Sequence, residues 1–156
     1  TGLLSRALTA PDGLVRIPLN EEKGEKVGQI EEYLREYKGE GIQHIACFTN
    51  DIYDTVERLK ANGVEFLDTP DTYFDVIDER VPNHGEDVPR LRRNKILIDA
   101  DVETKQQKLL QIFTLNAVGP IFFEIIQRKG NQGFGEGNFQ ALFESIERDQ
   151  MRRGVL

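Results

Sequence analysis

An apolar segment with a single carboxylate, GPIFFEIIQR from Gly119 to Arg128, constrains the fold of this chain most strongly. A run of β-branched and aromatic residues that follows Gly-Pro is typical of a buried strand. Side chains alternate along a strand, so we expect Phe122, Glu124 and Ile126 on one face. A charged carboxylate among apolar side chains is costly unless another group compensates it. Two interpretations of Glu124 stay open here: a carboxylate that meets an arginine or water, and a metal ligand.

Length and charge narrow the class of protein before any motif is considered. The 156 residues allow one ordinary domain with a sizeable core, and 38% hydrophobic with 30% charged residues is typical of a globular protein. The net charge of −7 disfavours nucleic acid as a partner, because phosphate binding needs a basic surface. No run approaches the roughly 18 apolar residues that a membrane span requires, so we expect no membrane partner.

Four basic residues and one cysteine have simple interpretations. The cluster Arg90, Arg92, Arg93 and Lys95 is flanked by acids and is expected to form a solvated face. The only cysteine, Cys47, excludes an internal disulfide and a cysteine-based zinc site. It lies in an apolar, strand-like segment, so we expect it to be buried.

The pattern of apolar residues predicts a mixed succession of strands and helices. Strands at 3–9 and 14–19 form a hairpin around Pro-Asp-Gly, and a helix follows at 29–37. The elements predicted after these are a strand at 41–49, a helix from Asn50 or Asp51 to Ala61, strands or extended segments at 64–67, 72–77, 95–98 and 109–114, a polar helix at 86–93, the Glu124 strand, a glycine-rich loop at 130–138 and a helix at 139–152. This order indicates an α+β fold.

The chain has two histidines in different surroundings. His44 lies on the apolar strand at 41–49, where Ala46 and Phe48 share its face. His84 lies in the polar turn Pro-Asn-His-Gly and is expected to be exposed and without a functional role. A lone strand histidine is more often a hydrogen-bonded core residue than a ligand. One histidine and one glutamate therefore do not define a metal site by themselves.

Four segments together resemble the 4-hydroxyphenylpyruvate dioxygenase family, in the C-terminal part of its catalytic domain: GIQHIA, LLQIFT, GPIFFEIIQR and GFGEGNFQALFESIE. The likeness runs from Leu3 to Arg148, nearly the whole chain. It implies the vicinal-oxygen-chelate superfamily, with βαβββ modules forming a curved mixed sheet around a metal site and a C-terminal lid helix. Glycines at 133, 135 and 137 are expected to hinge that helix.

The resemblance also implies how the chain is divided. Residues 1–38 correspond to the tail of a preceding βαβββ module with a connecting helix, and residues 39–128 to the module that carries the metal ligands. Residues 129–156 correspond to the glycine-rich loop and the C-terminal helix. The chain begins at Thr1, not Met, so we expect it to be one fragment of a larger enzyme.

The implied site is a non-haem Fe(II) centre held by two histidines and one glutamate. His44 matches the second histidine and Glu124 the glutamate, while the first histidine is expected upstream of Thr1, so the isolated chain is expected to be inactive. Matching positions for substrate binding are Ser5, Asn20, Gln43, Gln111, Phe113, Phe122, Phe134, Phe139 and Leu142. From the residues alone, each phenylalanine is equally consistent with core packing, and each glutamine with a buried amide whose partners are satisfied.

The implied activity is that of an Fe(II)-dependent 2-oxo acid dioxygenase in tyrosine and phenylalanine catabolism. Such an enzyme converts 4-hydroxyphenylpyruvate and O2 to homogentisate and CO2, and it is expected in the cytoplasm as a homo-oligomer. One alternative is 4-hydroxymandelate synthase, which uses the same substrate, iron and fold but oxidises the side chain. The other is a non-catalytic βαβββ binding module, because the first histidine is absent from this chain.

Overall fold

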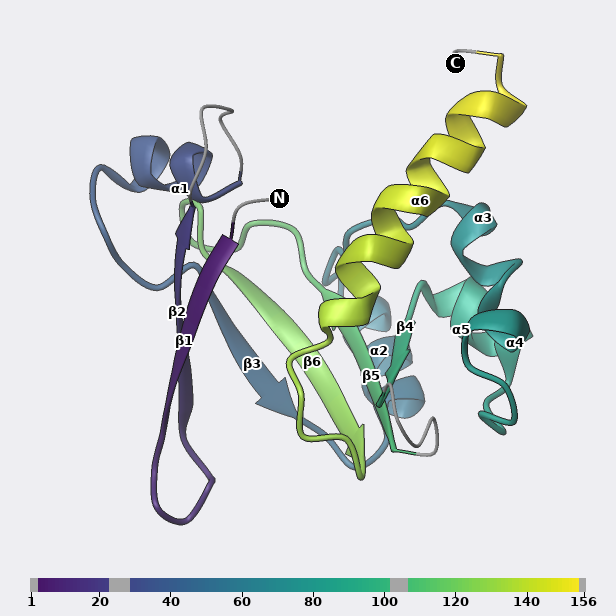
Figure 1. Cartoon of the computed structure of the whole chain (residues 1–156), viewed down its shortest axis with the longest axis horizontal. Coiled ribbons are helices and arrows are strands. Elements are labelled where there is room, and N and C mark those ends of the chain that lie inside the picture. Colours follow the sequence, from purple (N-terminus) through teal and green to yellow (C-terminus); the bar gives the residue numbers. More distant parts are fainter. Residues whose placement is uncertain (1–2, 23–28, 102–106, 155–156) are drawn as a thin grey trace. The chain divides into compact units, whose positions relative to one another are not determined.

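The computed structural model describes residues 3–22, 29–101 and 107–154, and these belong to two compact units (Figure 1). The first unit comprises Thr1–Gln43 together with Val118–Ile121, and the second comprises His44–Ala117 together with Phe122–Leu156. The module boundaries that the sequence predicts near residues 38 and 128 remain predictions.

The first unit contains an antiparallel hairpin and one helix. Strands β1 (Leu3–Thr9) and β2 (Arg16–Glu22) pair along their whole length, and α1 spans Gln29–Tyr37. The turn between the strands contains Gly13 in the left-handed region, at a φ of 72°. The predicted hairpin and helix are confirmed, although β2 begins and ends later than residues 14–19.

A four-stranded mixed sheet organises the second unit. Its elements in chain order are β3 (His44–Phe48), α2 (Ile52–Ala61), α3 (Asp71–Phe74), α4 (Ile77–Arg80), α5 (Val88–Asn94), β4 (Leu97–Ala100), β5 (Lys108–Phe113), β6 (Phe122–Lys129) and α6 (Glu136–Arg152). The strand order is β3-β6-β5-β4; β3 is parallel to β6, and the other neighbours are antiparallel. The predicted α+β class and βαβββ order are confirmed, with α3 to α5 inserted between α2 and β4.

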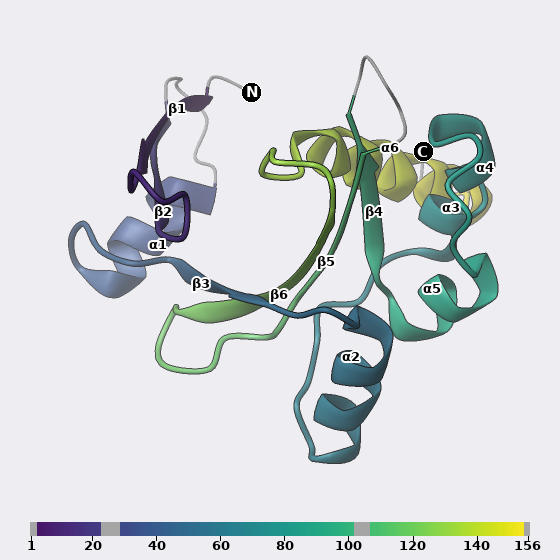
Figure 2. The same ribbon diagram turned by 90° about the horizontal axis from the view of Figure 1, so that it is seen from below.

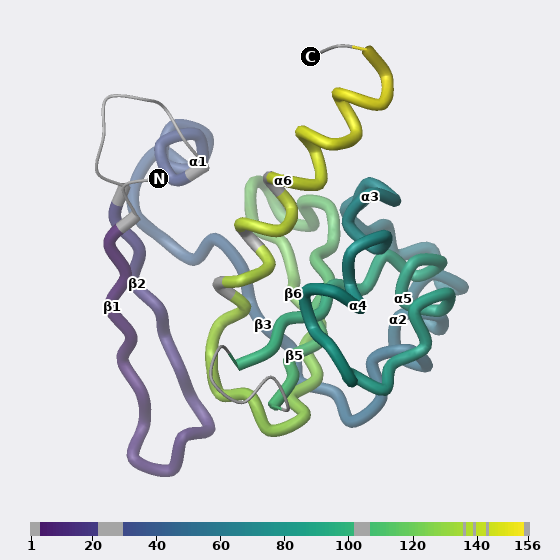
Figure 3. The backbone as a smooth tube through the Cα atoms, turned by 45° about the vertical axis from the view of Figure 1, so that its right-hand side comes forward, coloured from purple at the N-terminus to yellow at the C-terminus, as the bar shows by residue number. Residues whose placement is uncertain are grey.

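Helices α2 and α6 cover opposite faces of this sheet, which is curved (Figure 2). Helix α2 begins after Asp51, whose side chain accepts a hydrogen bond from the Asp54 amide, and it buries Ile52 and Val56. Helix α6 runs beside α3 (Figure 3) and also contacts β4. Within residues 3–22, 29–101 and 107–154, no helix is both long and apolar enough to cross a membrane.

The prediction of an extended segment at 72–77 is wrong. It forms most of the short helix α3 and the start of α4, in which Tyr73, Phe74 and Ile77 are buried. Their spacing of one and four residues fits one side of a helix, and these three side chains form part of the core. The strand predicted at 64–67 is reduced to one bridge between Phe66 and Thr114.

Two single residues also differ from their predicted surroundings. His84 is 5% exposed rather than solvated: its Nδ1 accepts from the Glu86 amide at 2.9 Å, and its Nε2 lies 2.9 Å from Asp78 Oδ1. This histidine therefore organises the loop after α4. Cys47 is exposed, because β3 is the edge strand of the sheet and Cys47 points away from the face of His44.

Candidate metal centre and pocket

The two predicted ligands lie on the same face of the sheet. The parallel register of β3 and β6 pairs His44 with Phe122 and Ala46 with Glu124, so His44 and Glu124 are diagonal neighbours. Their closest atoms, His44 Nε2 and Glu124 Oε2, are 3.8 Å apart. That distance is too long for a hydrogen bond between these two atoms but brings both donor atoms to one place.

Burial acts on both groups in a direction that disfavours a simple ion pair. Glu124 is 7% exposed. Burial raises the pKa of Glu124 to about 7, and the charge of Arg128 offsets this only in part. Burial also lowers the pKa of His44. A bound cation would favour the ionised carboxylate and the neutral imidazole, which are the forms that bind metals.

The donor set therefore fits a metal with imidazole and carboxylate ligands, of which this chain supplies two. The alternative interpretation was an arginine in contact with Glu124. Among the described residues no arginine forms an ion pair with Glu124, and the charge of Arg128 only partly offsets the effect of burial on its pKa. In the same part of the chain, no group of three or more His, Cys, Asp or Glu side chains is suited to hold a metal. The third ligand of the implied set remains a prediction.

Two aromatic rings form a wall beside this pair. Phe122 stacks on His44 with ring centroids 5.1 Å apart, and Phe113 meets both rings edge-on, at 6.4 Å from His44 and 6.0 Å from Phe122. Phe113 is also the register partner of Glu124 in β5. The structure thus brings together two of the predicted pocket phenylalanines and both predicted ligands, at one end of the β3–β6–β5 surface.

Gln111 continues the same face of the sheet with an unusual polar atom. The residue is 1% exposed, and its Oε1 has no hydrogen-bond partner among the described residues. Buried amides are normally paired, so the interpretation of a satisfied core amide is wrong for this atom. An unpaired acceptor on the face of Glu124 is consistent with a residue that binds a ligand.

The other predicted pocket residues divide into three groups. In the first unit, Ser5 Oγ donates to Asn20 Oδ1 at 2.7 Å; the place of these two residues and of Gln43 beside the metal pair remains a prediction. Phe134 is 37% exposed in the loop before α6, and Leu142 packs against the core. The side chain of Phe139 lies outside the described residues, although its backbone belongs to α6.

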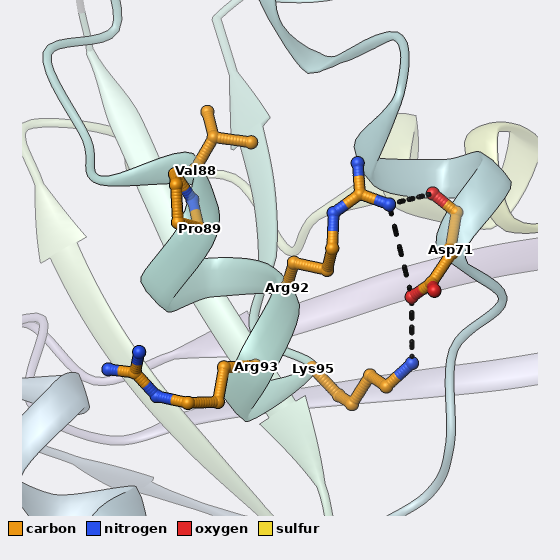
Figure 4. A pocket seen from close by; sticks show the side chains of 6 residues that line it. All are labelled: Asp71, Val88, Pro89, Arg92, Arg93 and Lys95. Carbon is orange, nitrogen blue, oxygen red and sulfur yellow. Dashed lines mark hydrogen bonds and ion pairs between the residues drawn. The ribbon is translucent and has the colours of Figure 1, made fainter.

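The basic cluster lies elsewhere: three of its residues, Arg92, Arg93 and Lys95, line a depression of about 520 Å³ at α5 (Figure 4). Arg92 and Lys95 both reach Asp71, and Arg92 also binds Asp75 at 2.8 Å. Arg90 binds Glu57 with two hydrogen bonds of 2.9 Å. These cations are ion-paired rather than merely solvated, so the depression presents little uncompensated charge. None of its lining residues belongs to the strands of the metal pair.

The sequence alone does not show how the start of α6 meets the sheet face that carries Gln111. A Cβ added at Gly135 would displace the Gln111 amide, and the φ of 79° at this position also favours glycine. The Gly137 amide donates to Asp99 Oδ2 at 3.0 Å, and Asn138 is 1% exposed. The available signal was the spacing Gly-x-Gly-x-Gly-Asn immediately before an amphipathic helix, which we interpreted only as a hinge.

Comparison with known proteins shows what the chain is similar to. A model of the Glyoxalase/Bleomycin resistance protein/Dioxygenase superfamily matches residues 1–76. The whole chain is 64% identical to a 4-hydroxyphenylpyruvate dioxygenase of Legionella pneumophila and 62% identical to one of Pseudomonas aeruginosa, covering 44% and 43% of those proteins. The structure also resembles a mutant of 4-hydroxymandelate synthase from Streptomyces coelicolor, with a TM-score of 0.77 and 34% identity over 95% of this chain and 42% of that one. The chain thus spans less than half the length of these relatives.

Proposed function

We propose that the chain belongs to the Glyoxalase/Bleomycin resistance protein/Dioxygenase superfamily and forms part of the active site of a 4-hydroxyphenylpyruvate dioxygenase. The superfamily model that matches residues 1–76 and the 64% identity over the whole chain support this proposal. The reaction is the conversion of 4-hydroxyphenylpyruvate and O2 to homogentisate and CO2. The observation that carries the proposal is the diagonal pair His44–Glu124, at 3.8 Å on one face of the β3–β6 pair.

In this proposal His44 and Glu124 would hold Fe(II). The third ligand is a histidine from outside this chain. Iron, when bound, supplies the redox chemistry with O2 that no amino-acid side chain can perform. The chain's own contribution is to hold two ligands on paired strands, whose backbone hydrogen bonds fix the separation of their Cα atoms.

The remaining residues of the face bind and orient the substrate. The amide of Gln111 can accept from a hydroxyl group or donate to a carboxylate, and the substrate carries both groups. Phe113 and Phe122 supply the apolar surface on which an aromatic ring packs, and they exclude water from the ligand side of His44. Phe134 and Leu142 are further members of the proposed pocket. The substrate-binding roles of Ser5, Asn20, Gln43 and Phe139 stay predictions.

Two alternatives are weaker than this proposal. The 62–64% identity to dioxygenases, against 34% to the 4-hydroxymandelate synthase, favours homogentisate over hydroxymandelate as the product. A non-catalytic module would not need a carboxylate whose pKa burial raises to about 7 beside a half-buried imidazole. The cytoplasmic location, the homo-oligomeric state and the place in tyrosine and phenylalanine catabolism remain predictions.

The test uses the full-length protein loaded anaerobically with Fe(II). Equimolar O2 consumption and homogentisate formation, followed by an oxygen electrode and liquid chromatography, are the expected result. Hydroxymandelate as the sole product would support the synthase instead. A protein that binds no iron would support the binding module. The 156-residue chain alone is expected to bind iron poorly and to show no turnover.

A further inference from the structure

A buried polar cluster joins four elements behind the candidate pocket. The hydroxyl of Tyr73 lies 2.6 Å from Asn138 Oδ1, and it accepts from Arg80 Nη2 at 2.7 Å and from the Ile98 amide at 3.0 Å. Tyr73 is fully buried and Asn138 is 1% exposed. The hydroxyl can donate to Asn138 Oδ1 or to the Ile98 carbonyl oxygen at 3.0 Å, and burial raises the pKa of Tyr73. We call Tyr73, Arg80 and Asn138 the Tyr73 cluster.

The Tyr73 cluster is not optimised for stability alone. Arg80 Nη1 and Asn138 Nδ2 are buried without hydrogen-bond partners among the described residues. Arg80 lies over the Tyr73 ring, 4.6 Å from its centroid, and also donates to the Ile98 carbonyl oxygen. Unpaired buried donors lower stability, so apolar side chains of similar shape would suit a purely structural role better. We therefore expect the cluster to hold another part of the protein in place.

The part that the cluster holds is the first turn of α6. Asn138 stands in this turn, and its amide donates to the Gly135 carbonyl oxygen at 3.0 Å. Gly135, the N-cap residue of the same turn, lies against Gln111. A Cβ added at Gly135 would overlap the Gln111 amide, at 2.6 Å from Nε2 and closer still to Oε1. A Cβ added at Gly137 would likewise overlap the Asp99 carboxylate. The Gly137 amide donates a hydrogen bond of 3.0 Å to Oδ2 of that carboxylate. A single helical turn therefore contacts both the Tyr73 cluster and the amide of Gln111.

We propose that Tyr73, Arg80 and Asn138 are positioning residues for Gln111. They hold the first turn of α6 on β4 and β5, and the Gly135 backbone in that turn limits how the Gln111 amide can rotate. The inference rests on the proposed function in one respect, because it takes the ligand of Gln111 to be an aromatic 2-oxo acid. A lid movement of α6 hinged at Gly133–Gly137 would have to break the bonds of Gly137 and Asn138, so the cluster also sets the resistance to that movement.

The test compares variants of the full-length, Fe(II)-loaded protein. Asn138→Ala removes the nearer of the two acceptors of the Tyr73 hydroxyl and leaves the Ile98 carbonyl oxygen, while Asn138→Asp keeps an acceptor at position 138. Arg152→Ala is the matched control, since Arg152 binds Asp75 through an exposed ion pair of 2.7 Å at the other end of α6. We expect Asn138→Ala to raise KM for 4-hydroxyphenylpyruvate at least tenfold with a smaller change in kcat, Asn138→Asp to restore KM to within about threefold, and Arg152→Ala to leave KM unchanged.

A double-mutant cycle identifies the route of the effect. If the Tyr73 cluster acts through Gln111, Asn138→Ala should add almost nothing to KM in a protein that already carries Gln111→Ala. The proposal would be overturned if the effects of Asn138→Ala and Gln111→Ala on KM multiply in the double variant. It would also be overturned if Asn138→Ala lowers the melting temperature and leaves KM unchanged. If Asn138→Ala does not fold, Tyr73→Phe removes only the hydroxyl and makes the same comparison.

Hydrogen exchange provides a readout that does not need turnover. We expect Asn138→Ala to speed exchange of the Gly135–Ala141 amides, while Arg152→Ala leaves them protected. Unchanged exchange in Asn138→Ala would contradict the proposal even in an active enzyme. If the wild-type protein shows no dioxygenase activity but Asn138→Ala still exchanges these amides faster than wild type, the proposed function is overturned and the anchoring of α6 stands.

Discussion

The imidazole of His44 and the carboxylate of Glu124 meet across a parallel strand pair, with Nε2 and Oε2 3.8 Å apart and burial opposing a charge on either group. Such a pair gains little from its own interaction, because each partner is more stable neutral in its surroundings. A shared cation changes this balance by favouring the ionised carboxylate. The predictions below begin from this relationship and move outward.

Removing either ligand should abolish iron binding. Glu124→Ala and His44→Ala in the full-length protein are expected to copurify with less than a tenth of the wild-type iron, measured by atomic absorption and by anaerobic titration. Asp54→Ala, in an exposed i,i+4 ion pair with Arg58, is the control and should keep its iron. An iron-loaded, active Glu124→Ala enzyme would refute the ligand assignment.

Gln111→Ala should weaken substrate binding more than it lowers stability. A hydrogen bond to a charged substrate group contributes about 1.5–3 kcal/mol, so KM should rise roughly 10- to 100-fold. The control is Gln127→Ala, on the opposite face, because Gln127 Oε1 accepts from the Ile52 amide at the start of α2. That variant should lower the melting temperature and leave KM unchanged. Equal KM values for both variants would remove Gln111 from the pocket.

Gly135→Ala should cost more than the conformational strain of its backbone. Gly135 has a φ of 79° and a Cβ would meet Gln111, whereas Gly63 has a φ of 86° with open space around it. Gly63→Ala is therefore expected to lose about 1 kcal/mol from the left-handed conformation alone. Gly135→Ala should lose clearly more in urea unfolding and should also raise KM. Similar losses in the two variants would mean that Gln111 moves aside freely.

Acid should destabilise the α2–α5 contact through Glu57. Hydrogen bonds from Arg90 and Asn94 hold the pKa of Glu57 at about 2, below its ordinary value of 4.5. Because the folded-state pKa is the lower one, the contribution is complete above pH 4.5 and is lost as the pH falls towards 2. The melting temperatures of wild type and Glu57→Gln should thus differ at pH 6 and converge near pH 2.5. A constant difference would contradict this linkage.

His84→Ala should destabilise the loop after α4. The variant leaves the Glu86 amide without its acceptor in a part-buried place, which should cost about 1–3 kcal/mol in urea unfolding. Asp78→Ala removes only a largely exposed carboxylate and should cost less than about 1 kcal/mol. Loss of less than 0.5 kcal/mol in His84→Ala, by the same urea measurement, would restore the original expectation of an inert histidine.

The strand faces of the site could be predicted from the sequence, because alternation fixes them without any tertiary information. Alternation predicts one face for His44 in β3, one for Gln111 and Phe113 in β5, and one for Glu124 in β6. The strand registers bring these three faces onto one surface of the sheet. What alternation cannot give is the strand order. That β6 lies between β3 and β5 depends on long-range packing, and only this order brings His44 beside Glu124.

The sequence-based predictions were wrong where burial outweighs the local pattern of residues. Tyr73 and Phe74 are aromatic and favour strands locally, but they are buried in α3 against the core. His84 sits in a turn that is polar in sequence, and its burial comes from two hydrogen bonds that no periodicity reports. Asn138 was overlooked for the same reason, because its partner Tyr73 lies far away in the chain.

The place of β6 has a consequence for how the protein is made. This strand is the last to be synthesised, yet it lies between β3 and β5 and joins them. While the ribosome has not yet released residues up to Lys129, β3 has no neighbour in the sheet and the β4–β5 hairpin has an open side. A nascent chain stalled before Phe122 would therefore present unpaired apolar strands, which makes it a target for chaperones or for aggregation.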